Sequence, residues 1–384
     1  MDGENWKEAI FLKRVSLKLM TFVIAFNSFG AFNIKVKIGD AKKKVEISGQ
    51  NITRNIVPLK SRKSFKGRKK FKFNCDDLGS NYKRRESLHL ASLSSKTGLV
   101  TYDNKKYIGN IHIITSKNTD SCDVINEIGI DQYISSLLSK EMNSSWPIEA
   151  LKAQAVAART YALNRIKKTE TIHYHLENSE KHQVNGDFFD VTMKTLRAAK
   201  QTAGYVLKNK KGELVPAFFH ASCGGRTLKP NEVWTNNVHG YHRGVNCGHC
   251  KTKKNWQKTI SKVRFRKFLS WLKKNDLVRF KSINKRIYIL RDNPEKKYLR
   301  VKLGSRIHKI RKSYLRRYFG RVDFSSNNFY MADSGANEFT FVGKGRGHGV
   351  GMCQVGAKSL AQRGWSYRKI LAHYFPDLEI KKVY

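Results

Sequence analysis

The sequence predicts an α+β protein: a β-rich N-terminal region, then a mixed α/β region that contains a β-rich basic insertion. Three patterns carry this prediction. Residues 34–38 and 44–48 alternate apolar and polar side chains, which is typical of strands with one buried face. Apolar residues then recur at helical spacing between about residues 131 and 167. Strand-like segments return among many lysines and arginines between residues 263 and 324.

Residues 1–30 are predicted to be a signal peptide or a membrane anchor. Lys13, Arg14 and Lys18 precede an apolar run at residues 19–31, which is the layout of a secretory signal. The run is too short for a comfortable membrane span, which needs about 20 residues. We therefore expect export, to the periplasm, the cell wall or the outer face of the cytoplasmic membrane. An uncleaved anchor or a buried strand is the alternative.

The chain is strongly basic, with a formal net charge of +45 over 384 residues. A field of this sign favours polyanions: nucleic acid, anionic lipid or an acidic cell-wall polymer. The basic residues are spread along the chain, and no zinc-finger, basic-zipper or RNA-recognition signature accompanies them. Together with the expected export, this counts against nucleic acid as the physiological partner.

The next elements of the N-terminal region are one basic segment and two strands. Residues 61–72 form a basic stretch, which we interpret as a solvated loop or as a hairpin with a basic outer face. Residues 107–115 and 123–128 are each predicted to be one strand. The β-rich region is therefore expected to span residues 31–122.

Two helices follow, at about residues 131–142 and 147–167, and a third at about 191–203. Pro147 suits the first turn of the second helix, and Glu149 favours its positive end. Many alanines on the inward face of that helix allow close approach to a neighbouring backbone.

Glu141 lies on the apolar stripe of the first helix. The stripe consists of Ile134, Leu137, Leu138 and Met142, at the spacing of a buried helical face. A carboxylate on such a stripe loses hydration, so its pKa is expected to rise. It is therefore a candidate proton donor near neutral pH. The alternative is a side chain that reaches solvent or pairs with a cation such as Arg159.

A glycine loop at residues 343–351 contains His348 and precedes a helix predicted at residues 355–362. Alternating glycines let a backbone come close to a ligand. The loop resembles neither a Walker loop nor a dinucleotide fingerprint. The alternative is a tight turn before the helix.

The chain has six cysteines: Cys75, Cys122, Cys223, Cys247, Cys250 and Cys353. In an exported protein, pairs such as Cys75 with Cys122 are candidate disulfides. Cys247 and Cys250 have metal or redox spacing. Together with Cys223 and one histidine, they would complete a structural zinc site. A Cys247–Cys250 disulfide is the alternative that the sequence leaves open. Redox catalysis is less favoured than either.

Several segments together resemble the stage II sporulation protein D family, the SpoIID/LytB domain of bacterial cell-wall proteins. They occur in the family's order at residues 131–133, 141–142, 145–147, 149–162, 182–184, 220–227, 347–357 and 370–374. The resemblance implies a SpoIID-type catalytic region over residues 123–384. The likeness is strong at residues 123–227 and 339–384 and loose at 251–338.

The resemblance implies a lytic transglycosylase of peptidoglycan that cleaves the MurNAc–GlcNAc bond and forms 1,6-anhydro-MurNAc, with Glu141 as its single acid and base. It also implies substrate contacts at family-motif positions: Arg159, Gln183, His220, Ser222, His348 and Gln354. No cofactor is expected for this chemistry. Other members of the family are described as enhancers of muramoyl amidases, which leaves a non-catalytic wall-binding role as the alternative.

Two positions depart from the family pattern. Some relatives carry a Cys/His metal cluster just before the position of Gln183, whereas this chain has no cysteine there. A zinc ion at that place would need His173, His175 and His182, and we do not expect one. Cys353 stands where the family often has serine, and it is expected to be a small buried residue.

Overall fold

The computed structural model describes residues 32–76, 87–115, 120–169, 173–177, 190–234, 243–250, 255–294 and 296–384. It contains helices and strands and is β-rich in its N-terminal region, which confirms the predicted α+β class. The predicted signal or anchor at residues 1–30 and the candidate Gln183 lie outside the described residues. Among the residues that are described, no helix is both long and apolar enough to cross a membrane.

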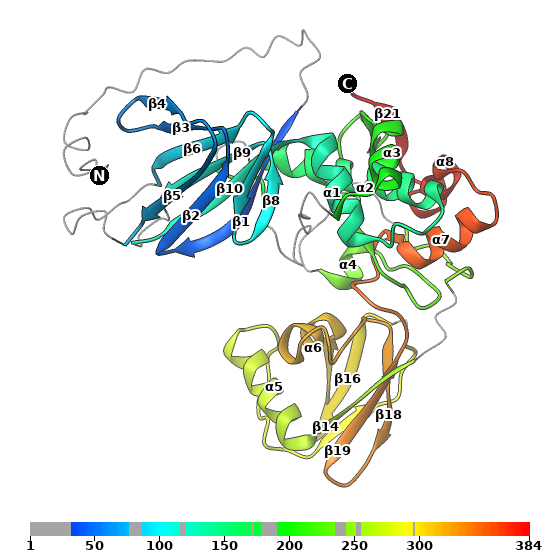
Figure 1. Cartoon of the computed structure of the whole chain (residues 1–384). Helices are drawn as coiled ribbons and strands as arrows, with labels where there is room; N and C mark the ends of the chain where they lie inside the picture. Colours follow the sequence, from blue (N-terminus) through cyan, green and yellow to red (C-terminus); the bar gives the residue numbers. More distant parts are fainter. Residues whose placement is uncertain are drawn as a thin grey trace. The chain divides into compact units, whose positions relative to one another are not determined.

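The chain forms two compact units. Unit 1 comprises Met1–Ser145, Ala162–Gly204 and Val383–Tyr384, and unit 2 comprises Trp146–Tyr161 and Tyr205–Lys382. Each unit contains segments that are far apart in the sequence, because the chain leaves unit 1 twice and returns (Figure 1). The division into residues 31–122 and 123–384 remains a prediction.

The β-rich part of unit 1 holds two sheets. One has seven strands in the order β11-β1-β10-β9-β6-β3-β4, and the other has four in the order β5-β2-β7-β8. The strand bounds are β1 (Asn33–Lys42), β2 (Lys44–Gln50), β3 (Ile52–Ile56), β4 (Ser61–Ser64), β5 (Arg68–Asn74), β6 (His89–Ser95), β7 (Leu99–Tyr102), β8 (Lys105–Ile108), β9 (Asn110–Thr115), β10 (Cys122–Gly129) and β11 (Leu176–Glu177).

A disulfide joins Cys75, just after β5, to Cys122 at the start of β10. These two strands belong to different sheets, so the bond links the two sheets covalently. Both cysteines lie in the apolar core that the sheets share. The predicted Cys75–Cys122 pair is thus confirmed.

Two predictions for the N-terminal region are wrong. Residues 107–115 do not form one strand, because the chain bends at Gly109 (φ 88°) and passes from β8 to β9 in the other sheet. A Cβ atom at Gly109 would lie 2.2 Å from the Glu127 carbonyl oxygen, so only glycine fits this bend. The basic stretch is not a loop or a hairpin, since β4 pairs with β3 and β5 pairs with β2. Its lysines and arginines are nevertheless largely exposed.

The three predicted helices are present as α1 (Ile130–Glu141), α2 (Ile148–Lys168) and α3 (Met193–Gln201). α1 contacts α3 within unit 1, where the Ser139 and Thr195 hydroxyl oxygens lie 3.0 Å apart. Thr192 caps α3, because its side chain accepts a hydrogen bond from the Thr195 amide. The alanines of α2 are buried, as predicted.

The core of unit 2 combines the first part of α2 with short elements from distant segments. Two strand pairs form there: β12 (Tyr205–Lys208) with β21 (Glu379–Lys382), antiparallel, and β13 (Phe219–His220) with β20 (Met352–Cys353), parallel. The helices of this part are α4 (Pro230–Val233), α7 (Gln354–Gln362) and α8 (Tyr367–Tyr374). One apolar cluster includes residues from α2, α7, α8 and β20.

The predicted basic insertion folds around a core of its own, rich in phenylalanine. Its elements are β14 (Trp256–Ser261), α5 (Lys262–Lys274), β15 (Ile287–Leu290), β16 (Tyr298–Leu303), β17 (Arg306–Arg311), α6 (Lys312–Phe319), β18 (Phe329–Ser334) and β19 (Glu338–Gly343). They form two three-stranded sheets, β14-β19-β18 and β15-β16-β17 (Figure 1, yellow to orange).

Lys312 of α6 is almost fully buried, with 1% of its surface exposed. Its ammonium group donates to the carbonyl oxygens of Pro294 (2.7 Å) and Asn293 (3.4 Å) and lies over the Phe329 ring. Burial lowers the pKa of Lys312 from 10.5 to about 7, although Asp292 opposes this shift. Lys312 lies in a stretch rich in lysine and arginine, and nothing in that local pattern distinguishes it from its exposed neighbours.

The stability of the insertion is expected to rise between pH 7 and pH 10.5. In this window the unfolded chain keeps the Lys312 proton and the folded chain has lost it, so raising the pH favours the folded state. The gain is on the order of 4 kcal/mol. Urea unfolding across this pH range measures it, with Lys312→Met expected to remove the rise and the exposed-site variant Lys309→Met to retain it. Equal pH profiles for the two variants would contradict the assignment.

Candidate active site

Glu141 is the last residue of α1, at the edge of a buried apolar face. Ile134, Leu137 and Leu138 are 0% exposed and Met142 is 4% exposed, so the predicted stripe is confirmed. The Met142 amide donates to the Leu138 carbonyl oxygen and closes the helix. Glu141 itself is half-buried. Its carboxylate therefore lies where an apolar surface ends, in unit 1.

The segment after α1 leads from Glu141 to the start of α2. Ser145 donates its amide to the Asn143 side chain (2.8 Å) and accepts a hydrogen bond at its carbonyl oxygen from Lys194 (3.1 Å). The hydrogen bond from the Ser145 amide to the Asn143 side chain closes a turn. These contacts fix the chain direction just beyond Glu141.

The other described site candidates lie in unit 2, where the glycine loop runs beside β13. Gly347 and Gly351 have positive φ values of 109° and 73°. A Cβ atom added to Gly347 would lie 2.8 Å from Cβ of His220. A Cβ atom added to Gly351 would lie 2.1 Å from the carbonyl oxygen of Phe218. The glycines thus permit close approach to another backbone segment of the protein. The expectation that they admit a ligand gains no support from this contact.

His220 and His348 meet across this contact, with ring centroids 5.6 Å apart. Nδ1 of His220 lies 3.0 Å from the Val350 carbonyl oxygen and therefore carries the proton, which leaves Nε2 as an acceptor. That Nε2 atom is buried and has no hydrogen-bond partner in the described part of the chain. Nδ1 of His348 accepts a hydrogen bond from the Val350 amide (3.0 Å).

Both histidines are neutral at pH 7. Burial lowers the pKa of His220 to about 4. Burial, followed by the neighbouring His220, holds the pKa of His348 well below its ordinary value. Neutral imidazoles act through hydrogen bonds, and in this pair His220 Nδ1 and His348 Nδ1 are both bonded to the backbone of Val350.

Aromatic rings surround His348 on one side. Its ring centroid lies 5.2 Å from Trp234 and 6.0 Å from Phe218. Phe218 also contacts Trp234 (4.6 Å) and Tyr161 (5.8 Å). All four rings are half-buried, and half-exposed aromatics with a few polar groups are typical of ligand sites. Sequence patterns did not single out Phe218, Trp234 or Tyr161, because these residues come from three separate segments.

The remaining candidates are buried. Arg159 on α2 is 0% exposed, and its guanidinium donates to the Tyr205 carbonyl oxygen (3.3 Å). Gln354 is 5% exposed and donates to the Gln154 side chain (3.4 Å). Ser222 is 6% exposed, and its backbone pairs with that of Arg346. This geometry favours a structural role for Arg159.

The cysteines of the predicted metal or disulfide site lie together. Cys223, Cys247, Cys250 and Cys353 are buried free thiols whose sulfur atoms all lie within 4.8 Å of one another. Two expectations need correction. The fourth member is Cys353, not a histidine, because β20 pairs with β13 and brings residue 353 beside the turn at Cys223. The disulfide between Cys247 and Cys250 is not formed.

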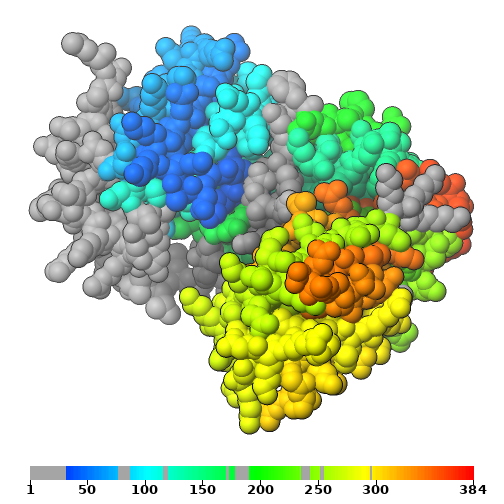
Figure 2. Space-filling view, turned by 90° about the horizontal axis from the view of Figure 1, so that it is seen from below, coloured from blue at the N-terminus to red at the C-terminus, as the bar shows by residue number. Residues whose placement is uncertain are grey.

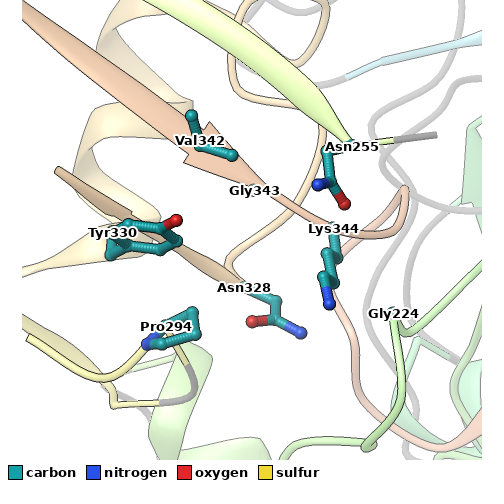
Figure 3. Close-up of a pocket in the computed structure, with 8 residues that line it drawn as sticks. All are labelled: Gly224, Asn255, Pro294, Asn328, Tyr330, Val342, Gly343 and Lys344. Atoms are coloured by element: carbon teal, nitrogen blue, oxygen red, sulfur yellow. The ribbon is translucent and has the colours of Figure 1, made fainter. Parts of the chain in front are cut away.

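A pocket opens elsewhere, beside the turn at Gly224 (Figure 3). It is lined by Gly224, Asn255, Pro294, Asn328, Tyr330, Val342, Gly343 and Lys344. None of the predicted site residues lines it, and it has no carboxylate. The pocket therefore lacks the carboxylic acid that usually protonates the leaving oxygen of a glycosidic bond.

The comparisons with known proteins agree with the motifs. The SpoIID family, described as "Stage II sporulation protein", matches residues 118–208, which include Glu141 and Arg159. The chain is 32% identical over 285 residues to an uncharacterized protein of Brachyspira hyodysenteriae, covering 73% of each chain. It is 29% identical to the amidase enhancer of Bacillus subtilis, covering 73% of this chain and 45% of the relative. It is 25% identical to stage II sporulation protein D of Bacillus amyloliquefaciens, covering 67% of this chain and 76% of the relative. The chain belongs to the stage II sporulation protein D (SpoIID) family.

Proposed function

We propose that this protein is a peptidoglycan lytic transglycosylase in which Glu141 is the single acid and base. The family and the amidase-enhancer relative support a cell-wall-related function. The observation that carries the enzymatic proposal is the placement of Glu141 at the end of α1, on the edge of a fully buried apolar face.

The proposed reaction needs one carboxylic acid. Glu141 donates its proton to the glycosidic oxygen while the bond from that oxygen to C1 of MurNAc breaks. The resulting carboxylate takes the proton of the MurNAc 6-hydroxyl, whose oxygen bonds to C1 and closes the anhydro ring. Glu141 is then protonated again, and no water is consumed. Hydrolysis would instead require a second carboxylate on the opposite side of the sugar.

Substrate binding is assigned to the half-exposed aromatic rings of Phe218, Trp234 and Tyr161 and to the half-exposed His348 beside them. Such rings can pack against the faces of sugars. His220 is 4% exposed and, like Gln183, stays a proposed contact on the strength of its family motif.

The second candidate function is that of a non-catalytic, wall-binding enhancer of a muramoyl amidase. The relative named amidase enhancer favours it, as does the burial of Arg159 and Gln354, which takes two proposed contacts away from the surface. Its partners would be glycan strands and an amidase. Export to the periplasm, the cell wall or the outer face of the cytoplasmic membrane, with or without anchoring by residues 1–30, belongs to either proposal.

Incubation of the purified protein with peptide-free glycan strands distinguishes the two functions. Mass spectrometry of the products is expected to show new anhydro-muramoyl ends and shorter strands. Strands that are retained but keep their length would reject the transglycosylase. Faster release of peptide from peptide-bearing peptidoglycan by an added muramoyl amidase would then identify the enhancer.

The basic insertion is expected to strengthen attachment to the anionic wall. Lys302 and Lys309 are exposed, and the strand register places them on the same face of the β15-β16-β17 sheet. This segment lies at the surface in the view of Figure 2, in yellow. Attraction between such charges and an anionic polymer is long-ranged at low salt and is screened as ions are added.

Lys302→Glu combined with Lys309→Glu is expected to lower several-fold the amount of protein that sediments with purified cell walls at low salt. The difference between this variant and the wild type is expected to vanish near 0.5–1 M salt. The control is Lys69→Glu with Lys72→Glu, which makes the same charge change on exposed residues of unit 1. An equal loss in both variants would show that net charge, not this face, governs attachment.

A further inference from the structure

We propose that Cys223, Cys247, Cys250 and Cys353 bind a structural zinc ion through all four sulfurs. The four sulfur atoms lie within 4.8 Å of one another, and those of Cys250 and Cys353 are 3.4 Å apart. A tetrahedral zinc ion with Zn–S bonds of about 2.3 Å separates its ligands by roughly 3.8 Å. Only small side-chain movements are needed to pass from this arrangement to a coordinated ion.

Each of the four sulfurs lies within hydrogen-bonding distance of at least one protein group that can donate to it. The donor pairs are Gly225 N to Cys223 Sγ (3.4 Å), Tyr374 OH with Cys247 Sγ (3.0 Å), Ser222 Oγ with Cys250 Sγ (3.2 Å), and Cys223 N and Gly356 N to Cys353 Sγ (3.4 and 3.3 Å). Donors around every ligand stabilise negative sulfur, which is the form that binds zinc. Such outer contacts are typical of metal sites.

The ligands come from three segments that the fold brings together. Cys223 lies in the turn after β13, and Cys353 lies at the end of β20 and caps α7. Cys247 and Cys250 form a tight turn, closed by a hydrogen bond from the Cys250 amide to the Cys247 carbonyl oxygen (3.0 Å). Two ligands three residues apart in a turn are common in structural zinc sites.

The position of the cluster in the sequence indicates a stabilising role for the ion. The basic insertion, β14 to β19, lies between Cys250 and Cys353 in the sequence. A metal that binds both residues closes this long loop and holds the two ends of the insertion to the core. Closing a long loop removes much conformational entropy from the unfolded chain. The ion is thus assigned to stability, and with four protein ligands it has no open position for catalysis.

Disulfides and free thiols are the competing states. The Cys75–Cys122 bond fits an oxidising environment. In such an environment four adjacent free thiols would pair with one another unless a metal held them. Zinc explains why the protein keeps four sulfurs so close without bonding them, because coordination protects thiolates from oxidation.

The test uses the full chain, produced in zinc-containing medium and analysed for metal by mass spectrometry. One zinc per chain is expected. Replacement by Co²⁺ is expected to give the intense sulfur-to-cobalt charge-transfer absorption and the visible bands of a tetrahedral four-sulfur site. Alkylation in denaturant with a chelator is expected to modify four cysteines and leave Cys75–Cys122 intact.

Cys353→Ser is expected to lower zinc content and to weaken the cobalt bands, whereas Cys75→Ser with Cys122→Ser is expected to keep one zinc. The cobalt spectrum and the count of free thiols are measured on the wild-type chain, so they still test the proposal if Cys353→Ser fails to fold. Two additional disulfides without metal would overturn the proposal, as would four free thiols without metal. Full zinc retention in Cys353→Ser would remove that residue from the site.

Discussion

Replacing Glu141 with glutamine is expected to reduce glycan-strand cleavage by roughly 10²–10⁴-fold, the usual contribution of a positioned acid or base. Glutamine has the shape of the glutamate side chain and can still accept a hydrogen bond, but it cannot supply or remove a proton at neutral pH. Both proton transfers of the proposed reaction therefore fail together. The measurement is the release of anhydro-muramoyl ends over time.

The substitution is expected to leave folding unchanged. Glu141 is half-buried at the end of α1, and the apolar contacts of that helix come from other residues. Glu379→Gln is a matched control, because Glu379 is an exposed carboxylate of β21, and it should retain full activity. Equal activity of Glu141→Gln and wild type, with both folded, would sink the assignment of Glu141 as the acid.

Gly351→Ala is expected to destabilise unit 2 by about 3 kcal/mol or more. Gly351 has a φ of 73°, where a side chain costs about 1–2 kcal/mol. In addition, the new Cβ would lie 2.1 Å from the Phe218 carbonyl oxygen. That oxygen accepts the hydrogen bond from the Met352 amide that joins β13 to β20, so relief of the clash pulls these strands apart. The cost of such overpacking adds to the strain.

Gly364→Ala separates the two effects. Gly364 has a similar φ of 80°, but no atom lies near the position of its Cβ. It is expected to cost only the strain, about 1–2 kcal/mol. Urea unfolding of the full chain, followed by tryptophan fluorescence, compares the variants. Equal losses for both would mean that the close approach of the glycine loop to β13 contributes nothing to stability.

Local patterns predicted the elements that depend on local chemistry. The helices begin and end near the predicted residues. The signals that set them, such as Pro147 and the apolar stripe that includes Leu137, affect only the few residues next to them. The strands β1 and β2 alternate as predicted, with Ile34, Val36 and Ile47 at 0% exposure. The same reasoning made Glu141 a candidate, because the apolar stripe beside it belongs to its own helix.

Features that depend on distant contacts were missed or misassigned. Gly109 bends the chain because of its contact with the carbonyl oxygen of Glu127, which no pattern around Gly109 reveals. Lys312 looks like any other lysine of a basic run, yet the fold places it against the carbonyl oxygens of Asn293 and Pro294. The burial of Arg159 also depends on the segments that cover α2.

The sequence by itself determined the α+β class, the helices around Glu141 and the family, and it offered Cys75 and Cys122 as one candidate disulfide pair, which the structure then assigned. Only the tertiary structure decided that Cys353 completes a four-sulfur cluster and that His220 and His348 face each other. The reason is the range of the interactions. Hydrophobic periodicity and capping act over one or two turns of chain. These groups instead meet because the parallel pairing of β13 with β20 joins residues 133 positions apart.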